Sequence, residues 1–286
     1  LLGDHVDAAG GHAFDHVRTA LERMLEAARP ADLMIPLRIQ RERGNRLAEI
    51  GLELETWGDI EADDVYVVLV DPARGMDEGR RDPDGLHVWS RRHRALRARA
   101  NAYIGGWGLG LAALEAAEAY NQAQIGVLGG GGYDLPVLSA IRQAGKRWVR
   151  FVPQLRQAQR PGSSGDRLSL IESHESRGMA IGALEQALQT GDVDIPSAEV
   201  LRSIMDCVVD AKGKILAGPR GPDEDMILAG WALAVCQTLA NSLQPPRVRE
   251  QDTSMGQFRE ALKREFGRDV LAPRLRPPGE LDLNRA

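Results

Sequence analysis

Residues 65–75, with the sequence VYVVLVDPARG, decide the fold class of this 286-residue chain. Four of the first six residues are β-branched valines and the other two are Tyr66 and Leu69. Such a nearly continuous apolar run is typical of a central strand that is buried on both faces. The run ends at Asp71 and Pro72, which begin a turn. A carboxylate at that position lies at the edge of the sheet where α/β proteins bind their ligands. We therefore take Asp71 as the first candidate for chemistry.

Segments with strand-like and helix-like patterns alternate around this run. Strands are expected at 50–57, 86–90, 125–128 and 148–152, and helices at 14–29, 109–120, 134–145, 173–190, 197–210 and 226–240. Ser197 is expected to cap the helix that follows it. The alternation predicts an α/β fold with a mixed central sheet flanked by helices.

Composition divides the chain into three regions. Residues 1–60 are expected to form an N-terminal helix and a connecting segment, and residues 61–244 the core domain. After two prolines the composition changes, so residues 245–286 are expected to be a tail with a short helix at 254–266.

The overall composition excludes several classes of protein. The chain is 43% hydrophobic with a net charge of −5, which is ordinary for a globular protein and excludes a uniformly basic nucleic-acid coat. There is no signal peptide and no apolar run of about 18 residues, so we expect a cytoplasmic protein. Cys207 and Cys236 are too few for a disulfide framework or a four-cysteine zinc site, and we expect two reduced thiols.

Carboxylates occur at two element ends that are far apart in sequence. Asp71 ends the central strand, and Asp223-Glu224-Asp225 precede the helix at 226–240. The second group has an alternative explanation as helix-capping residues, because the helix dipole favours acids at a helix N-terminus. If the two groups converge, their oxygens suit Mg²⁺ or Mn²⁺ rather than zinc. Two ions roughly 3.5–4 Å apart would activate water against a phosphodiester.

Two other features bear on nucleotides or nucleic acids. The glycine run at 129–132 is not a phosphate-binding loop, because no Lys-Ser or Lys-Thr pair follows it. The densest positive patch is either a solvated surface or a stripe that contacts phosphates without reading sequence. Its members are Arg91, Arg92, His93, Arg94, Arg97 and Arg99.

The order of these features resembles the nuclease domain of tailed-phage large terminase subunits, which has the RNase H-like fold. Residues 66–75 are similar to the first strand of that family and to its Asp-Pro-Ala-x-Gly turn. Residues 116–127 are similar to its helix-to-strand passage, where Tyr-Asn precedes the strand. Residues 176–177, 191–197 and 224–229 follow its closing order, in which an acidic pair precedes a helix of small residues.

The resemblance implies a set of site residues, with one departure. Asp71 is implied as the bridging metal ligand, and Glu224 and Asp225 as the second carboxylate group. The family carries an acid at the end of its second core strand, where this chain has Leu128. Asp84 and Asp134 are the candidates to replace that acid. Arg91, Arg92, Arg94 and Arg177 are implied as DNA contacts.

The resemblance also implies a function. The expected activity is two-metal, Mg²⁺- or Mn²⁺-dependent cleavage of double-stranded DNA, with water as the nucleophile and no strong sequence preference. The ATPase half of the family is absent from the sequence, and the portal and other terminase subunits are the implied partners. Because Leu128 replaces an acid, a catalytically silent DNA-gripping or motor-assembly module is the alternative. An unrelated RNase H-like nuclease, such as a resolvase, is the third.

Overall fold

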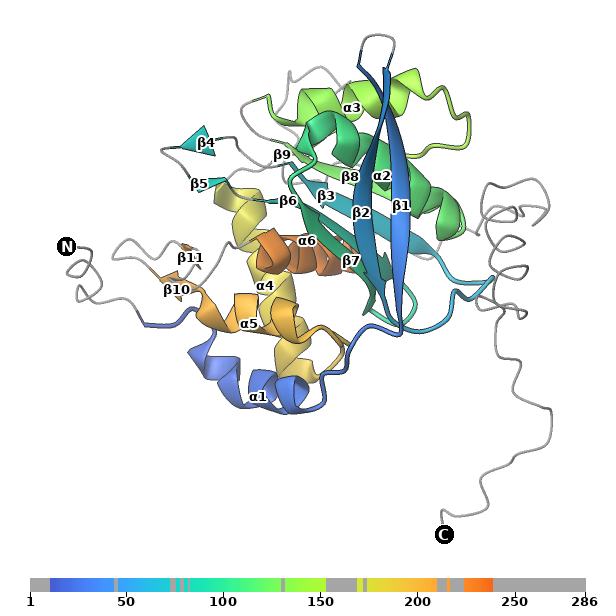
Figure 1. Ribbon diagram of the computed structural model, residues 1–286. Coiled ribbons are helices and arrows are strands. Elements are labelled where there is room, and N and C mark those ends of the chain that lie inside the picture. The colour runs from blue at the N-terminus through green and yellow to red at the C-terminus, as the bar shows by residue number, and fades with distance from the viewer. Residues whose placement is uncertain are drawn as a thin grey trace, which may run out of the picture.

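A computed structural model describes residues 11–43, 46–72, 76–77, 80–81, 83–129, 132–152, 169–171, 174–209, 215–216 and 224–238. Its centre is a seven-stranded sheet in the order β1-β2-β7-β6-β3-β8-β9 (Figure 1). The strands are β1 (Leu33–Arg43), β2 (Arg46–Thr56), β3 (Tyr66–Asp71), β6 (Asp84–Ser90), β7 (Ala95–Ala102), β8 (Gln124–Gly129) and β9 (Ser169–Ile171).

The sheet is mixed, as the sequence predicts. Strand β3 pairs antiparallel with β6 on one side and parallel with β8 on the other. Every side chain from residue 66 to 70 is buried, which confirms the central strand. We call the edge of the sheet at which β3 and β8 end the carboxyl edge.

Helices cover both faces of the sheet. They are α1 (Arg18–Glu26), α2 (Gly105–Ala119), α3 (Asp134–Gln143), α4 (His174–Thr190), α5 (Ala198–Asp206) and α6 (Glu224–Thr238). Figure 1 shows α2 and α3 on one face and α4 and α6 on the other. Helix α5 contacts α6 and α1. The Ser197 hydroxyl accepts from the amide of Val200 at 3.4 Å and caps α5 as expected. Short elements complete the described fold: the 3₁₀ turn η1 (Asp15–Val17) and two small ribbons, β4 (Met76–Asp77) with β5 (Arg80–Arg81) and β10 (Val208–Val209) with β11 (Ile215–Leu216).

The alternation of side chains along β3 assigns each residue to one face. Val68 and Val70 pack with α2 and α3, whereas Val67 and Leu69 pack with α4 and α6. Successive strand residues point to opposite faces, so Asp71 continues the series of Val67 and Leu69. The carboxylate of Asp71 therefore lies on the α6 face.

Helices α4 and α6 cross at a point where α6 has no side chain. A Cβ atom built on Gly230 would lie 2.8 Å from the carbonyl oxygen of Ala180. A real Cβ does not approach backbone so closely, and only glycine allows this approach. The close crossing holds α6 firmly against the layer that carries the candidate acids.

The structure differs from the sequence-based expectations in three places. Residues 33–43 and 95–102 form strands that we did not expect, and residues 148–152 contribute only a single bridge, between Phe151 and Ile125. Strand β2, within the expected connecting segment, joins the sheet through β7. The boundary at residue 61 stays a prediction, and the tail at 245–286 with its helix at 254–266 lies outside the described residues.

Two further sequence expectations concern membranes and thiols. Among the helices within the described ranges, none is both long and apolar enough to cross a membrane. Cys207 and Cys236 are free cysteines, as expected. Burial raises the pKa of the Cys236 thiol to about 12, so this thiol stays protonated at neutral pH.

Candidate active site at the carboxyl edge

The candidate site begins with Asp71, the last residue of β3. In the sheet register Asp71 lies opposite Gly85 of β6, and Gly85 lies opposite Asn101 of β7. Residues directly opposite each other on antiparallel strands share a face. The row Asp71–Gly85–Asn101 therefore faces α6.

Glu224, the first residue of α6, lies over the gap that Gly85 leaves in this row. A Cβ atom built on Gly85 would lie 3.6 Å from Glu224 Cβ and 2.8 Å from Leu228 Cδ1. The missing side chain lets α6 sit close to the sheet, and Glu224 is buried there. Asp71 and Glu224, which are 153 residues apart in sequence, thus flank the same glycine.

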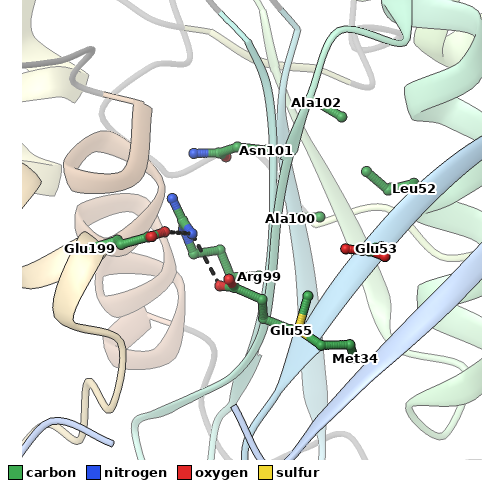
Figure 2. Close-up of a pocket in the computed structure, with 9 residues that line it drawn as sticks. All are labelled: Met34, Leu52, Glu53, Glu55, Arg99, Ala100, Asn101, Ala102 and Glu199. Carbon is green, nitrogen blue, oxygen red and sulfur yellow. Dashed lines mark hydrogen bonds and ion pairs between the residues drawn. The ribbon is translucent and has the colours of Figure 1, made fainter. Parts of the chain in front are cut away.

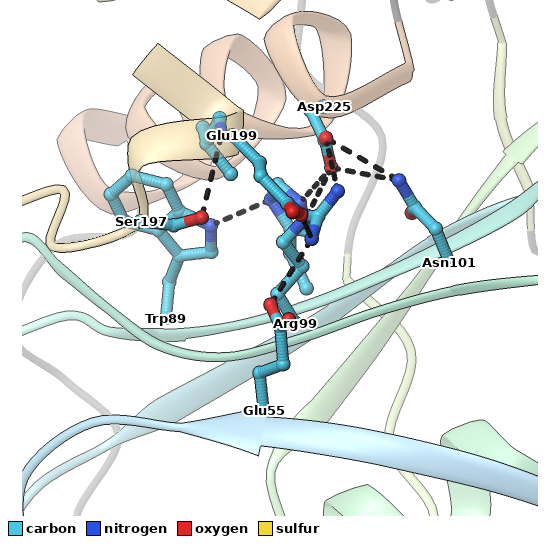
Figure 3. A network of polar contacts seen from close by, with 9 residues as sticks. Glu55, Trp89, Arg99, Asn101, Ser197, Glu199 and Asp225 are labelled. Carbon is cyan, nitrogen blue, oxygen red and sulfur yellow. Dashed lines mark hydrogen bonds and ion pairs between the residues drawn. The ribbon is translucent and has the colours of Figure 1, made fainter. Parts of the chain in front are cut away.

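Asp225 is occupied by a network of its own. Arg99 Nε donates to Asp225 Oδ1 at 3.0 Å, and Arg99 Nη2 donates to Oδ2 at 2.8 Å (Figure 3). His87 Nε2 lies 2.8 Å from Oδ1. Burial would raise the pKa of Asp225, but the bonds from His87 and Arg99 outweigh it and hold that pKa well below its usual range. Asp225 is thus a paired, ionised carboxylate.

His87 stands in this network as a neutral imidazole. Burial lowers its pKa despite the contact with Asp225. The Trp89 indole nitrogen lies 3.5 Å from His87 Nδ1, which indicates that Nδ1 is the unprotonated nitrogen. His87 therefore donates from Nε2 to Asp225.

Arg99 also binds acids from the other side. Its Nη1 donates to Glu55 of β2 at 3.1 Å and to Glu199 of α5. Both ends of the Asn101 amide are satisfied when its oxygen accepts from Arg99 Nη2 at 3.0 Å and its nitrogen donates to Ala100 O at 2.9 Å. In the opposite orientation, which Figure 3 shows, the amide nitrogen lies 3.3 to 3.4 Å from Asp225. One guanidinium thus ties α6, β2 and α5 together.

Asp84 lies at the same edge but on the other face. Its Oδ2 accepts from the amides of Ile104 and Gly105, at 3.1 and 2.7 Å, at the start of α2. Asp84 belongs to the same alternation as Leu86 and Val88, which pack with α2 and α3. The structure therefore does not bring Asp84 beside Glu224, and it gives this carboxylate a helix-capping role.

Asp134 is placed similarly, in the first turn of α3. Its Oδ2 lies 3.0 Å from the position of a Cβ built on Gly129. Gly129 follows Leu128 in β8 and faces away from α6. Asp134 thus lies on the α3 side of the sheet, whereas Asp71 and Glu224 lie on the α6 side.

Leu128 occupies the position where the resemblance implies an acid. In β8 it lies one residue beyond Val127, which pairs with Val70, so Leu128 is the neighbour of Asp71. Leu128 is 2% exposed and packs on the α6 face with Leu170, its partner in β9. A hydrophobic side chain therefore closes the site on the β8 side.

The fit of a divalent cation follows from these placements. Asp71 and Glu224 offer hard carboxylate oxygens from two elements, which suit Mg²⁺ or Mn²⁺. Within the part of the chain that the structure describes, no group of three His, Cys, Asp or Glu side chains is close enough to hold a metal ion. The described residues thus offer two candidate ligands, Asp71 and Glu224, at the carboxyl edge.

The predicted DNA-contacting arginines lie at two different edges. Arg91, Arg92 and Arg94 form the turn after Ser90, which pairs with Tyr66 at the start of β3. This turn lies roughly 16 Å from Asp71 along the strand. Arg92 donates to Asp63 at 2.7 Å, and Arg94 binds Asp192.

Arg177 lies on the side of the candidate acids. It belongs to the first turn of α4, which starts three residues after β9 ends at the carboxyl edge. Its Nη2 donates to the carbonyl of Ile215 at 3.5 Å. Of the four predicted arginines, Arg177 is the one that the structure places at the edge of Asp71.

A cleft of about 580 Å³ opens beside β7 (Figure 2). It exists because β2 and β7 pair only at Glu55–Arg99 and Thr56–Ala98 and then diverge. Three acids and one arginine are its charged lining residues. The full lining is Met34, Leu52, Glu53, Glu55, Arg99, Ala100, Asn101, Ala102 and Glu199. Such a cleft repels phosphate.

The roles of His87 and Arg99 do not follow from the expected positive patch, of which Arg99 is a member. The alternation in LRARANA (residues 96–102) is nevertheless the pattern of a strand with one polar face. His87 had a weaker signal, a titratable residue in the middle of an apolar strand. Neither pattern identifies Asp225 as the partner of these residues, because each contact joins residues that are at least 126 positions apart in the sequence.

The order and directions of β7, β6, β3, β8 and β9, with helices on both faces, define an RNase H-like α/β fold. No model of a protein family matches this sequence, and no curated protein matches it. The structure is similar to that of the large terminase nuclease of the thermophilic phage G20c. The TM-score is 0.50 and the identity 18%, covering 79% of this chain and 98% of that one. The magnesium-bound form of that nuclease matches with the same TM-score and identity over 77% and 96%. The resemblance to large terminase nuclease domains is thus confirmed at the level of the fold.

Proposed function

We propose that this chain is the nuclease domain of a phage DNA-packaging terminase and hydrolyses phosphodiester bonds of double-stranded DNA with Mg²⁺ or Mn²⁺. The observation that carries the proposal is that Asp71 lies opposite Gly85 in the sheet register, and that Glu224 lies over the same glycine. In α/β proteins the carboxyl edge of the central strands is where ligands bind. The likeness to a nuclease with bound magnesium supports the choice of cation.

In this proposal the residues of the chain bind and orient. Asp71 and Glu224 hold the cation, which when bound activates water and stabilises the leaving oxygen. Arg177 lies at the same edge and orients the phosphate backbone. The acidic cleft beside β7 disfavours a path on that side, so the duplex approaches across β8 and α4.

A second candidate function has its own supporting observation. Leu128 closes the site beside Asp71, and Asp225 is paired with Arg99. If neither residue 128 nor Asp225 supplies a metal ligand, the chain would be a catalytically silent module that grips DNA or assembles the packaging motor. An unrelated RNase H-like enzyme of the resolvase kind is distinguished by its preference for branched over linear duplex.

Plasmid nicking and linearisation in Mn²⁺ tests the proposal, with EDTA and Asp71→Ala as controls. We expect cleavage that needs both the metal and Asp71. Absence of cleavage, with duplex binding retained and weakening as salt rises, would establish the silent module instead. Faster cleavage of a four-way junction than of linear duplex would favour the resolvase.

A further inference from the structure

The two neighbouring acids of α6 have different surroundings. Both oxygens of Asp225 are engaged by Arg99, and one of them also by His87. Glu224 instead faces the gap at Gly85, next to Asp71. Adjacent acids at one helix start thus face different neighbours.

We infer that Asp225 is an anchor rather than a cation ligand, and that Arg99 and His87 are positioning residues that act through it to set Glu224 opposite Asp71. This inference rests on the proposed function. It adds to that function by assigning Glu224 as the cation ligand and Asp225 as the structural partner of Arg99.

The geometry of Arg99 supports an anchoring role. A bidentate guanidinium–carboxylate pair defines both the distance and the orientation of its partners. Arg99 is 9% exposed as a side chain and Asp225 8%, so water competes little for either group. Since Asp225 and Glu224 are consecutive, orienting one in the first turn of α6 also orients the other.

The remaining contacts of Arg99 extend the anchor across the sheet. Glu55 from β2 and Glu199 from α5 bind the same Nη1. The guanidinium that binds Asp225 is therefore itself held by side chains of two other elements, which limits how far the first turn of α6 moves. Outer contacts of this kind set metal affinity through the ligands that they hold.

The variant Arg99→Gln distinguishes an anchoring role of Asp225 from a ligand role, because the two roles predict opposite changes in Mn²⁺ affinity. Calorimetry and the EPR signal of free Mn²⁺ measure this affinity. If Asp225 is an anchor, the affinity falls by about 10-fold, because the first turn of α6 loosens. If Asp225 is a ligand that Arg99 withholds, the affinity rises, and the inference is overturned.

A neutral pair and a conservative variant complete the set. In the double variant Asp225→Asn/Arg99→Gln the two amides still form a hydrogen bond. If Asp225 is an anchor, the Mn²⁺ affinity of this variant stays within about 3-fold of that of the wild type. If Asp225 is a ligand, the affinity falls by about 10- to 100-fold, as in Glu224→Gln. Arg99→Lys retains the charge without the fork and is expected to recover part of the affinity. At saturating Mn²⁺ the cleavage rate of Arg99→Lys should return to near that of the wild type, which a general loss of fold would not allow.

A readout without metal keeps the inference separate from the proposed function. Amide hydrogen exchange at residues 228–231 should accelerate about 10-fold in Arg99→Gln, because α6 opens locally when its anchor is lost. Arg18→Gln, which removes an exposed pair with Glu22 on α1, is the matched control and should leave this exchange unchanged. Unchanged exchange in Arg99→Gln would overturn the anchor even if the protein binds no Mn²⁺. Absence of Mn²⁺ binding with accelerated exchange would instead refute the proposed function alone.

Discussion

Arg99 grips Asp225 through both oxygens, with Nη2 2.8 Å from Oδ2 and Nε 3.0 Å from Oδ1. The pair joins the middle of β7 to the first turn of α6. It also leaves Glu224, rather than Asp225, over Gly85, the residue that lies opposite Asp71 in the sheet. The structure thus separates two acids that the sequence presents as one group.

Removing Arg99 is expected to cost much of the stability of the domain. Arg99→Met leaves the buried Asp225 charge uncompensated, for which the expected loss is about 3–5 kcal/mol in the free energy of unfolding. Urea denaturation followed by circular dichroism measures it. Arg18→Gln, at an exposed pair, should leave the free energy almost unchanged. Similar small losses in both variants would show that the Arg99–Asp225 pair is not a structural element.

Stability is expected to fall as the pH drops below about 6.5, partly because of His87. Because the pKa of His87 is lowered in the folded state, His87 becomes protonated in the unfolded chain at a higher pH than in the folded chain. The loss is at most about 1.4 kcal/mol for each pH unit and continues until the folded His87 is protonated. Asp225, whose pKa is also lowered, adds a second loss below about pH 4.

Thermal or urea unfolding of the wild type and of His87→Gln between pH 7 and 5 isolates the histidine contribution, since the other histidines are common to both proteins. The wild type should lose more stability over this range. Parallel curves would contradict a neutral buried His87.

Leu128→Asp is expected to create a metal response. The new carboxylate lies beside Asp71 on the α6 face, so without metal the variant is less stable than the wild type, because it buries a charge. Mn²⁺ should then raise its melting temperature by more than it raises that of the wild type. Leu128→Ala loses the same packing without adding an acid, and it should show no enhanced response to Mn²⁺. Equal Mn²⁺ responses of Leu128→Asp and Leu128→Ala would refute the placement of residue 128 beside Asp71.

Gly85→Ala is expected to push α6 away from the sheet. The added methyl group would lie 2.8 Å from Leu228 Cδ1 in a packed core, and overpacking costs about 1–3 kcal/mol. DNA cleavage should fall with it, because Glu224 moves away from Asp71. The matched control is Gly178→Ala in α4, where a Cβ meets nothing within 4 Å and the helix should gain about 0.5–1 kcal/mol. Unfolding curves and plasmid cleavage report both effects, and full cleavage by Gly85→Ala would contradict the geometry.

Asp84→Ala tests the assignment of Asp84 to α2. Loss of the bonds to the Ile104 and Gly105 amides should cost about 0.5–2 kcal/mol of stability. Mn²⁺-dependent plasmid cleavage should survive, and Asp84→Asn should recover most of the stability, since asparagine also caps helices. Loss of cleavage by a folded Asp84→Asn would restore Asp84 as a ligand candidate.

The sequence predicts the central part of the fold well, for a physical reason. Residues 65–70 are apolar on both faces, so only a central strand fits them, and the position of Asp71 follows. Strand β7 was missed because its arginines suggested a surface, although three of its alternate positions are buried alanines or leucine that pack in the core. The charged arginines hide the two-residue alternation that is typical of a strand.

The site was less predictable because its contacts join distant segments. Asp84 and Gly85 are adjacent, yet one faces α2 and the other α6, and no local pattern tells which face carries the metal. The division of roles between Glu224 and Asp225 depends on Arg99, which lies more than 120 residues earlier in the sequence.

A crystal structure grown with Mn²⁺ tests the central claim most directly, through the anomalous scattering of manganese. The account predicts a manganese peak between the carboxylates of Asp71 and Glu224, with Asp225 still bound to Arg99. A peak on Asp225 with Arg99 displaced, or no peak at the carboxyl edge in a protein that cleaves DNA with Mn²⁺, would contradict it.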